Sequence, residues 1–307
     1  MLADQIDRYL ISLINLRSAQ TIQWYRKRLA PLKSLNQNIG SIALSDLQCL
    51  YAELANRKTK YIDHPSKRAP QAGPLSQATL RGYVRAWRVF FNWCVDCNLI
   101  SCSPARKLTL PKMPAQPPKA ISRINMELIV EEARKSSARD YAIACLLADS
   151  ACRVGGLCNI TLDNLDLEHC QAIVVEKGQT RFLLFGRQTV EAIQAYLYER
   201  PIVPYRELFI GHKGVPLKTG GVHALLDRLA DAAGITDRHN PHAFRHGWAR
   251  SALDDGAELT QVAQYLGHQQ VQTTYQFYGR WDTKELHDLR ERVSWLRKEE
   301  PEAVKDL

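Results

Sequence analysis

The strongest constraint on this chain lies in residues 240–281, which read NPHAFRHGWARSALDDGAELTQVAQYLGHQQVQTTYQFYGRW. The first part predicts a helix on which His242 and Arg245, three residues apart, share one face. Leu-Gly-His at 266–268 predicts a helix end, because glycine is free to take the left-handed conformation that closes many helices. A further helix is then expected to carry a tyrosine-rich run that includes Tyr278.

The side chains of this stretch favour phosphate chemistry over metal chemistry. Their spacing matches no zinc-binding pattern, and the 8 cysteines are scattered, so that Cys94 and Cys97 have no second pair at the spacing of a zinc ribbon. We therefore expect no bound metal and no cofactor. Arginine and histidine instead suit the binding of a phosphodiester, and a tyrosine hydroxyl suits its attack.

The same stretch resembles the C-terminal half of the tyrosine recombinase (phage integrase) family. The family pattern is H-x-x-R, then L-G-H, then a nucleophilic tyrosine, and this chain has HAFR from residue 242, LGH from residue 266 and a tyrosine ten residues after that histidine. The resemblance implies that His242, Arg245 and His268 belong to the active site and that Tyr278 is the nucleophile.

The choice of nucleophile depends on spacing. Some family members place the tyrosine nine residues after the histidine of LGH, where this chain has Phe277, and others place it ten residues after, often before a glycine. Tyr278 followed by Gly279 fits the second form. Tyr275 is the alternative, but it lies one helical turn earlier and is expected to be a packed aromatic side chain.

Two upstream segments complete the resemblance. SACRVGGL, residues 150–157, is similar to the family's Thr-Gly-x-Arg-x-x-Glu-Leu, which implies that Arg153 is the first catalytic arginine. Arg153 lies between two apolar segments, so its charge needs an anionic partner. Gly156 stands where the family usually has an acid that helps to fix this arginine. We therefore expect Arg153 to be supported differently here.

AIVVE at 172–176 and RFLLF at 181–185 predict two strands of a hairpin. The family carries its catalytic lysine in such a turn, commonly within Gly-Lys-Gly, which implies that Lys177 is catalytic, although Glu176 replaces the first glycine. A lysine in a turn is otherwise simply solvated. The implied catalytic set is complete and in order: Arg153, Lys177, His242, Arg245, His268 and Tyr278.

The N-terminal part of the chain is strongly basic. Residues 1–112 hold 17 of the 41 Lys and Arg residues but only 6 of the 32 Asp and Glu residues. The net charge of this part is therefore +11, whereas that of the whole chain is +9. Such a concentration is typical of a surface that binds a polyanion, although a solvated surface is the alternative.

Apolar positions at helical spacing predict helices within residues 1–97, with Ser18 or Thr21, Ser45 and Ser76 as caps. A basic, proline-bearing segment follows the third helix and is expected to be a long exposed loop. We expect DNA contacts from this loop and from one face of the fourth helix: Arg57, Lys58, Lys60, Lys67, Arg68, Arg81, Arg85 and Arg88.

The resemblance implies a mainly α fold with a small antiparallel β-sheet in the C-terminal domain, arranged as a two-domain, C-shaped clamp. We expect a helical core-binding, DNA-binding domain over 1–108, a linker over 109–120 and a catalytic domain over 121–285. Residues 286–307 are expected to form a C-terminal helix and tail that docks in trans on a neighbouring copy, with packing in cis as the alternative.

The implied function is site-specific recombination. Such an enzyme cleaves and rejoins double-stranded DNA through a 3′-phosphotyrosine intermediate, without metal or ATP, as a homotetramer on two synapsed sites, and serves integration or excision of a mobile element or a related recombination. The alternatives are cutting and rejoining like a topoisomerase or a telomere resolvase, and a non-catalytic DNA-binding synapsis factor. No run of about 18 apolar residues and no signal peptide occurs, so we expect no membrane partner and a cytoplasmic protein.

Overall fold

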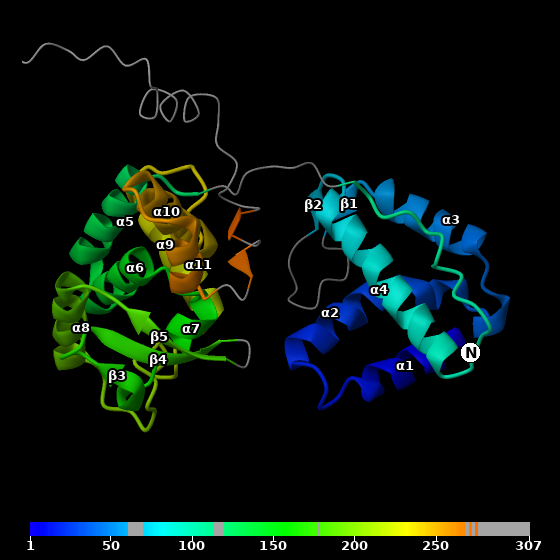
Figure 1. Ribbon diagram of the computed structural model, residues 1–307, viewed down its shortest axis with the longest axis horizontal. Helices are drawn as coiled ribbons and strands as arrows, with labels where there is room; N and C mark the ends of the chain where they lie inside the picture. The colour runs from blue at the N-terminus through cyan, green and yellow to red at the C-terminus, as the bar shows by residue number, and fades with distance from the viewer. Residues whose placement is uncertain (61–69, 113–119, 177–178, 268–269, 272–273, 276–307) are drawn as a thin grey trace, which may run out of the picture. The chain divides into compact units, whose positions relative to one another are not determined.

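The computed structural model describes residues 1–60, 70–112, 120–176, 179–267, 270–271 and 274–275. The chain divides into two compact units, 1–115 and 116–307, and the boundary falls inside the expected linker. Figure 1 shows a helical N-terminal unit and a C-terminal unit of helices with a small sheet at one side. The fold class is thus the predicted one, mainly α with small antiparallel sheets.

The N-terminal unit is built on four helices: α1 Leu2–Ser12, α2 Ala19–Leu29, α3 Leu44–Ala55 and α4 Gln77–Asp96, with 3-10 turns at Ala30–Leu35 and Ile39–Ser41. Ser18 and Ser76 cap α2 and α4 as predicted, each accepting a backbone N–H bond at 3.2 Å. The third helix starts earlier than predicted, because the Asp46 carboxylate accepts from the N–H of Ala43 at 2.8 Å, which leaves Ser45 inside the helix.

The long helix α4 supplies the largest fully buried side chains of this unit. Its side chains Trp87, Phe90 and Phe91 are fully buried, and Trp87 Nε1 donates to the carbonyl of Arg28 at 2.9 Å, which fastens α4 to α2. The two ends of the basic segment after α3 form strands rather than the predicted loop, since strand β1 Thr59–Lys60 pairs with strand β2 Gln71–Ala72. Residues 61–69, with Lys67 and Arg68, lie outside the described residues.

The C-terminal unit contains seven described helices: α5 Arg123–Ser136, α6 Ala138–Ser150, α7 Val154–Cys158, α8 Arg187–Glu199, α9 Thr219–Ala232, α10 Pro241–Asp254 and α11 Leu259–Tyr265, with a 3-10 turn at Leu162–Asn164. Helix α6 is the centre of the unit, because α5, α8 and α10 all contact it and Ile143, Leu146 and Leu147 are fully buried (Figure 1). Ser122 and Ser137 cap α5 and α6.

The sheet of this unit has the antiparallel order β3 Leu165–Asp166, β4 Gln171–Glu176 and β5 Gln179–Leu184. Strand β5 begins two residues earlier than predicted, since Glu176 and Gln179 are register partners at the end of the hairpin. Side chains alternate along β4, so Glu176 lies on the same buried face as Ala172 and Val174, while Val175 points to solvent. Strand alternation thus directs a carboxylate into the protein.

Candidate active site

Arg153 lies at the start of α7, immediately after the end of α6. The chain turns there through Ala151, which has a positive φ of 50°. The Arg153 guanidinium donates through Nη1 to Glu176 Oε2, and the backbone N–H of Arg153 donates to Glu176 Oε1 at 3.3 Å. Glu176 is therefore the anionic partner that the sequence required for this arginine.

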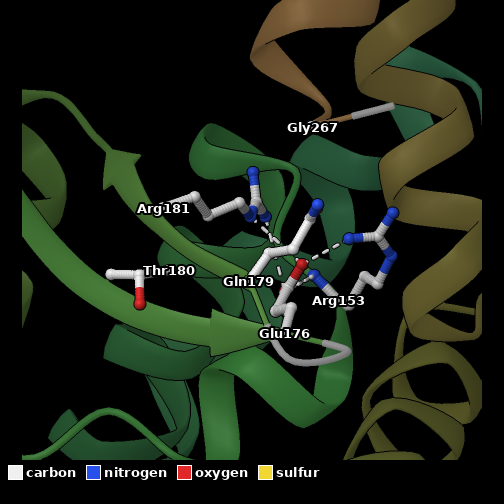
Figure 2. A pocket seen from close by; sticks show the side chains of 6 residues that line it. All are labelled: Arg153, Glu176, Gln179, Thr180, Arg181 and Gly267. Atoms are coloured by element: carbon white, nitrogen blue, oxygen red, sulfur yellow. Dashed lines mark hydrogen bonds and ion pairs between the residues drawn. The ribbon is translucent and has the colours of Figure 1, made fainter. Parts of the chain in front are cut away.

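Glu176 is buried between two arginines (Figure 2). Arg181 on β5 donates to it through Nε at 3.1 Å and through Nη2 at 3.4 Å, opposite Arg153. Burial alone would raise the pKa of Glu176, but the charge of Arg181 and the hydrogen bond and charge of Arg153 outweigh it and hold the pKa below its usual range. Glu176 is therefore an ionised carboxylate at neutral pH.

Arg245 extends from α10 into the same region and is 4% exposed. Its Nη1 donates to the carbonyl of Ala151 at 2.8 Å, and its Nη2 donates to the carbonyl of Leu266. Desolvation, followed by the charges of Arg153 and Arg181, lowers the pKa of Arg245 to about 10. Arg245 stays positively charged at neutral pH, so its charge adds to those of Arg153 and Arg181 in this part of the structure.

The end of α11 is held by two of these arginines. Arg181 Nη1 donates to the carbonyl of Tyr265 at 3.1 Å, and Arg245 donates to the next carbonyl, that of Leu266. Cations at the last carbonyls of a helix satisfy groups that have no intrahelical partner. Gly267 then closes the helix with a φ of 64°, as the sequence predicted. These contacts fix the backbone that leads to His268.

His242 occupies the first turn of α10. Asn240 caps this helix, since its side-chain oxygen accepts from the N–H of Ala243 at 3.0 Å. The imidazole of His242 is exposed, and its pKa is lowered by desolvation first and then by the charges of Arg245 and Arg153. His242 is therefore neutral at physiological pH and able to accept a proton. The pKa of the neighbouring His246 is lowered to about 4, mainly by burial.

A pocket opens beside Arg153 and Arg181. It is lined by Arg153, Glu176, Gln179, Thr180, Arg181 and Gly267 (Figure 2). The pocket brings the predicted Arg153 together with Glu176 and Arg181, two residues that sequence reasoning did not assign to the site. The excess of positive charge makes this region suited to an anion such as a phosphodiester.

Three of the six predicted catalytic residues lie in the described structure: Arg153, His242 and Arg245. Lys177, His268 and Tyr278 lie outside the described residues, although their neighbours Glu176 and Gly267 line the pocket. Tyr275 is 53% exposed, so the prediction that it packs as a buried aromatic is wrong. Exposure leaves Tyr275 accessible as the alternative nucleophile.

The predicted DNA-binding residues divide into two groups. Arg81 Nη1 donates to the carbonyl of Pro111 at 2.7 Å, and Arg88 Nη2 donates to the carbonyl of Leu108 at 2.5 Å, so both hold the segment that follows α4. Arg85 and Lys58 are exposed, while Arg57 and Lys60 are half-buried. Contact with DNA stays a prediction for these residues.

Within the described ranges, no group of three or more His, Cys, Asp or Glu side chains is placed to hold a metal ion. The same ranges contain no helix of sufficient length and apolar character to cross a membrane.

Comparison with protein families gives the class of this protein. The model of the phage integrase family matches residues 119–285, which hold the whole arginine cluster. The chain belongs to this family. Its members are tyrosine recombinases, and the protein is accordingly a tyrosine-type site-specific DNA recombinase.

Similar proteins agree with this family over most of the chain. Tyrosine recombinase XerC of Corynebacterium glutamicum is 30% identical over 277 residues, which cover 88% of this chain and 84% of that protein. Tyrosine recombinase XerC of Leptospira interrogans is 31% identical over 246 residues, which cover 77% of this chain and 74% of that protein.

Two solved structures share the fold of this chain. The integrase of transposon Tn1549, in complex with a circular intermediate DNA, has a TM-score of 0.73 and 16% identity, and covers 95% of this chain and 99% of its own. The XerH recombinase bound to a palindromic difH substrate has a TM-score of 0.70 and 18% identity, and covers 95% of this chain and 84% of its own. At this level of identity, these structures establish the fold.

Proposed function

We propose that this protein cleaves and rejoins two specific DNA sites through a covalent 3′-phosphotyrosine intermediate. One observation carries the proposal: Arg245 donates to the carbonyl of Ala151 at 2.8 Å, two residues before Arg153, so the arginines of the two motifs lie in the same part of the unit. The charge of Arg153 accordingly contributes to the lowered pKa of Arg245. Two like charges held close together destabilise the folded protein, so binding of an anion between them is favoured. A phosphodiester is suited to be that anion, because its negative charge is shared by two non-bridging oxygens.

Arg153 and Arg245 are proposed to bind the two non-bridging oxygens of the scissile phosphate. The planar guanidinium donates in a fork that matches these oxygens, and the pair stabilises the charge of the pentacoordinate transition state. Donors of this kind each contribute roughly 10²–10³ in rate, by analogy with an oxyanion hole. The arginines supply the positive charge that a metal ion supplies in other phosphoryl-transfer enzymes.

Tyr278 is proposed as the nucleophile. A bond forms between its hydroxyl oxygen and phosphorus, and the bond from phosphorus to the 5′-oxygen breaks. His242 accepts the tyrosine proton, Lys177 donates a proton to the leaving 5′-oxygen, and His268 donates a further hydrogen bond to the phosphate. A phenol, with a pKa of about 10, leaves more readily than an alkoxide, so a 5′-hydroxyl from the second site can reverse the step without ATP.

We infer that the two units hold duplex DNA as a clamp, with residues 1–108 as a DNA-binding domain and 121–285 as the catalytic domain. The excess of basic residues in 1–112 supports this inference. Strand exchange between two sites requires four active sites, so we propose a homotetramer on synapsed DNA, with residues 286–307 docking on a neighbouring copy. We propose that the protein uses this chemistry to integrate or excise a mobile element.

The non-catalytic alternative is weakened by the arrangement around Arg153. Its sequence argument was the loss of an acid at Gly156, but Glu176 supplies a carboxylate to Arg153. A protein that only bridges DNA sites has no need for a carboxylate that orients Arg153 in this way. The topoisomerase-like alternative shares the chemistry and differs in whether the strands change partners.

Strand exchange separates these functions. Two duplexes with different labels, both taken from the flanks of the gene, are incubated with the purified protein and analysed for hybrid products. We expect covalently rejoined hybrids. Relaxation of a supercoiled plasmid without hybrids would indicate a topoisomerase, and binding without cleavage of a site that the protein recognises would indicate a synapsis factor.

A further inference from the structure

The carboxylate of Glu176 lies at the position where a side chain on Gly156 would begin. A Cβ at this position would lie 2.3 Å from Glu176 Oε1, 3.2 Å from its Cδ and 3.3 Å from its Cγ. Cβ atoms in proteins essentially never approach another heavy atom closer than 3.0 Å, so any side chain at 156 requires the carboxylate to move. The preceding Gly155 is different, because a Cβ there would meet nothing within 4 Å.

The position of Gly156 is the one at which the family pattern has an acid. We infer that this chain has moved the acid that positions Arg153 from helix α7 to strand β4, so that Glu176 is the positioning residue and Gly156 is the vacancy that admits it. This inference rests on the proposed function, in which Arg153 binds the scissile phosphate. Glutamate at 176 and glycine at 156 are then a coupled pair of substitutions relative to the family pattern, and each is unfavourable without the other.

The hydrogen bonds show why Glu176 can take this role. Oε1 accepts from the backbone N–H of Arg153 at 3.3 Å and from Arg181 Nη2 at 3.4 Å. Oε2 accepts from Arg153 Nη1 and from Arg181 Nε at 3.1 Å. Four donors match the roughly four acceptor sites of a carboxylate, so its orientation is determined from both sides. The Arg153 guanidinium is thereby fixed at one nitrogen beside the pocket.

The register of the hairpin places this acid. Glu176 pairs with Gln179, and alternation along β4 turns Glu176 toward α7, where Gly156 lies. A shift of one residue in the register would turn the carboxylate to solvent. The residue that follows Glu176 in the chain is Lys177, the proposed general acid. The residue that supports Arg153 and the proposed general acid are thus adjacent in the sequence.

A purely structural role for Glu176 makes a different prediction. Arg181 also binds the carbonyl of Tyr265, so Glu176 could serve only to fasten β5 and α11 to the unit. In that case, its loss would lower stability, and DNA binding and cleavage would fall together. A positioning role instead slows the chemical step at saturating DNA and leaves DNA affinity unchanged.

The test uses the full chain and four variants: E176Q, G156E, the exchange variant G156E/E176G, and G155E as the matched control. Each is assayed for binding to a nicked duplex that carries the recombination site, for the single-turnover rate of covalent adduct formation at saturating protein, and for thermal unfolding. Glutamine keeps the shape of Glu176 and removes its charge. The control adds the same acid to the same helix at a position with open space.

We expect E176Q to slow adduct formation by about 10- to 100-fold, the usual effect of removing the partner that orients a functional group, with a dissociation constant within about twofold of wild type. G156E should be slow and less stable, because two carboxylates compete for one place. G156E/E176G should be faster than either G156E or E176Q, and this non-additivity is the signature of residues that share one interaction. G155E should match wild type.

Two results would overturn the inference: an unchanged cleavage rate in E176Q, or an exchange variant no faster than G156E. If E176Q proves unstable, the exchange variant decides, because it restores an acid beside Arg153 from the other element. A wild-type protein that binds its site and forms no adduct would refute the proposed function instead.

Discussion

The guanidinium of Arg181 donates to the backbone carbonyl of Tyr265 at 3.1 Å, so strand β5 is joined to the last turn of α11. The same side chain binds Glu176 through Nε and Nη2. Arg181 thus connects the carboxylate that supports Arg153 with the helix end that precedes His268. The reaction proposed for this protein requires both parts at one phosphate.

Replacement of Arg181 by alanine should destabilise the protein. It leaves a buried carboxylate with one of its two cationic partners, and breaking a buried pair costs about 3–5 kcal/mol. We expect a loss near the lower end, about 3 kcal/mol in the free energy of unfolding by urea, since Arg153 remains. The matched control is R206A, which breaks the exposed pair of Arg206 with Asp163 and should leave the unfolding midpoint unchanged. Equal effects of the two variants would contradict a special role for Arg181.

The lowered pKa of Glu176 predicts a pH dependence of stability. Its pKa in the folded protein is below the unfolded value of about 4.5, so its contribution is fully present above that value and is lost as the pH falls through the lower, folded pKa. The free energy of unfolding should therefore fall below about pH 4.5 in wild type and fall less steeply in E176Q. Urea titrations between pH 7 and pH 3 measure both slopes, and parallel curves would show that Glu176 does not contribute.

Much of the fold followed from local patterns. Ser18 and Ser76 lie at the helix starts that the sequence indicated, because an N-cap bond involves residues close in the chain. The start of α3 was predicted wrongly. The carboxylate of Asp46, the third residue of the helix, accepts from the N–H of Ala43, so the residue at the N-cap position carries no capping signal of its own.

The site was predictable where a motif carried it and not where a long-range contact did. Arg153, His242 and Arg245 were selected from their motifs, and their catalytic roles stay predictions. The pairing of Arg153 with Glu176 spans 23 residues and depends on hairpin register, which residue types alone do not determine. The signal was nevertheless present as two departures from the family pattern, an acid missing at Gly156 and a glycine replaced by Glu176. Only the structure shows that the carboxylate of Glu176 lies in the space that a side chain at position 156 would need.

The neutral state of His242 predicts a pH profile for cleavage. Desolvation and the charges of Arg245 and Arg153 lower its pKa from 6.5, so it is deprotonated and able to act as a base throughout the range above that value. Single-turnover cleavage with the DNA below saturation should be constant near pH 7 and decline only below pH 6.5. H242Q should be slower by about 10²–10⁴ and lose this acid limb. A midpoint above pH 7 that persists in H242Q would assign the titration to another group.

Two arginines of α4 provide a matched pair for DNA binding. Arg85 is exposed, whereas Arg81 donates to the carbonyl of Pro111. R85A should weaken DNA binding and reduce the slope of log affinity against log salt by about 1, the value for one lost phosphate contact, without changing the unfolding midpoint. R81A should lower the unfolding midpoint through the lost bond. An unchanged salt slope in R85A would remove Arg85 from the DNA interface.

The central claim is that Tyr278 attacks the phosphate held by Arg153 and Arg245. The most direct measurement is the site of the covalent protein–DNA adduct. Nicked duplexes tiled from the flanks of the gene are incubated with the protein, denatured and digested, and the modified peptide is read by mass spectrometry. We expect a nucleotide linked through a 3′-phosphate to Tyr278, absent in Y278F and retained in Y275F. An adduct on Tyr275, which is 53% exposed, would contradict the assignment of the nucleophile, and binding of a specific duplex with no adduct at all would contradict the proposed reaction.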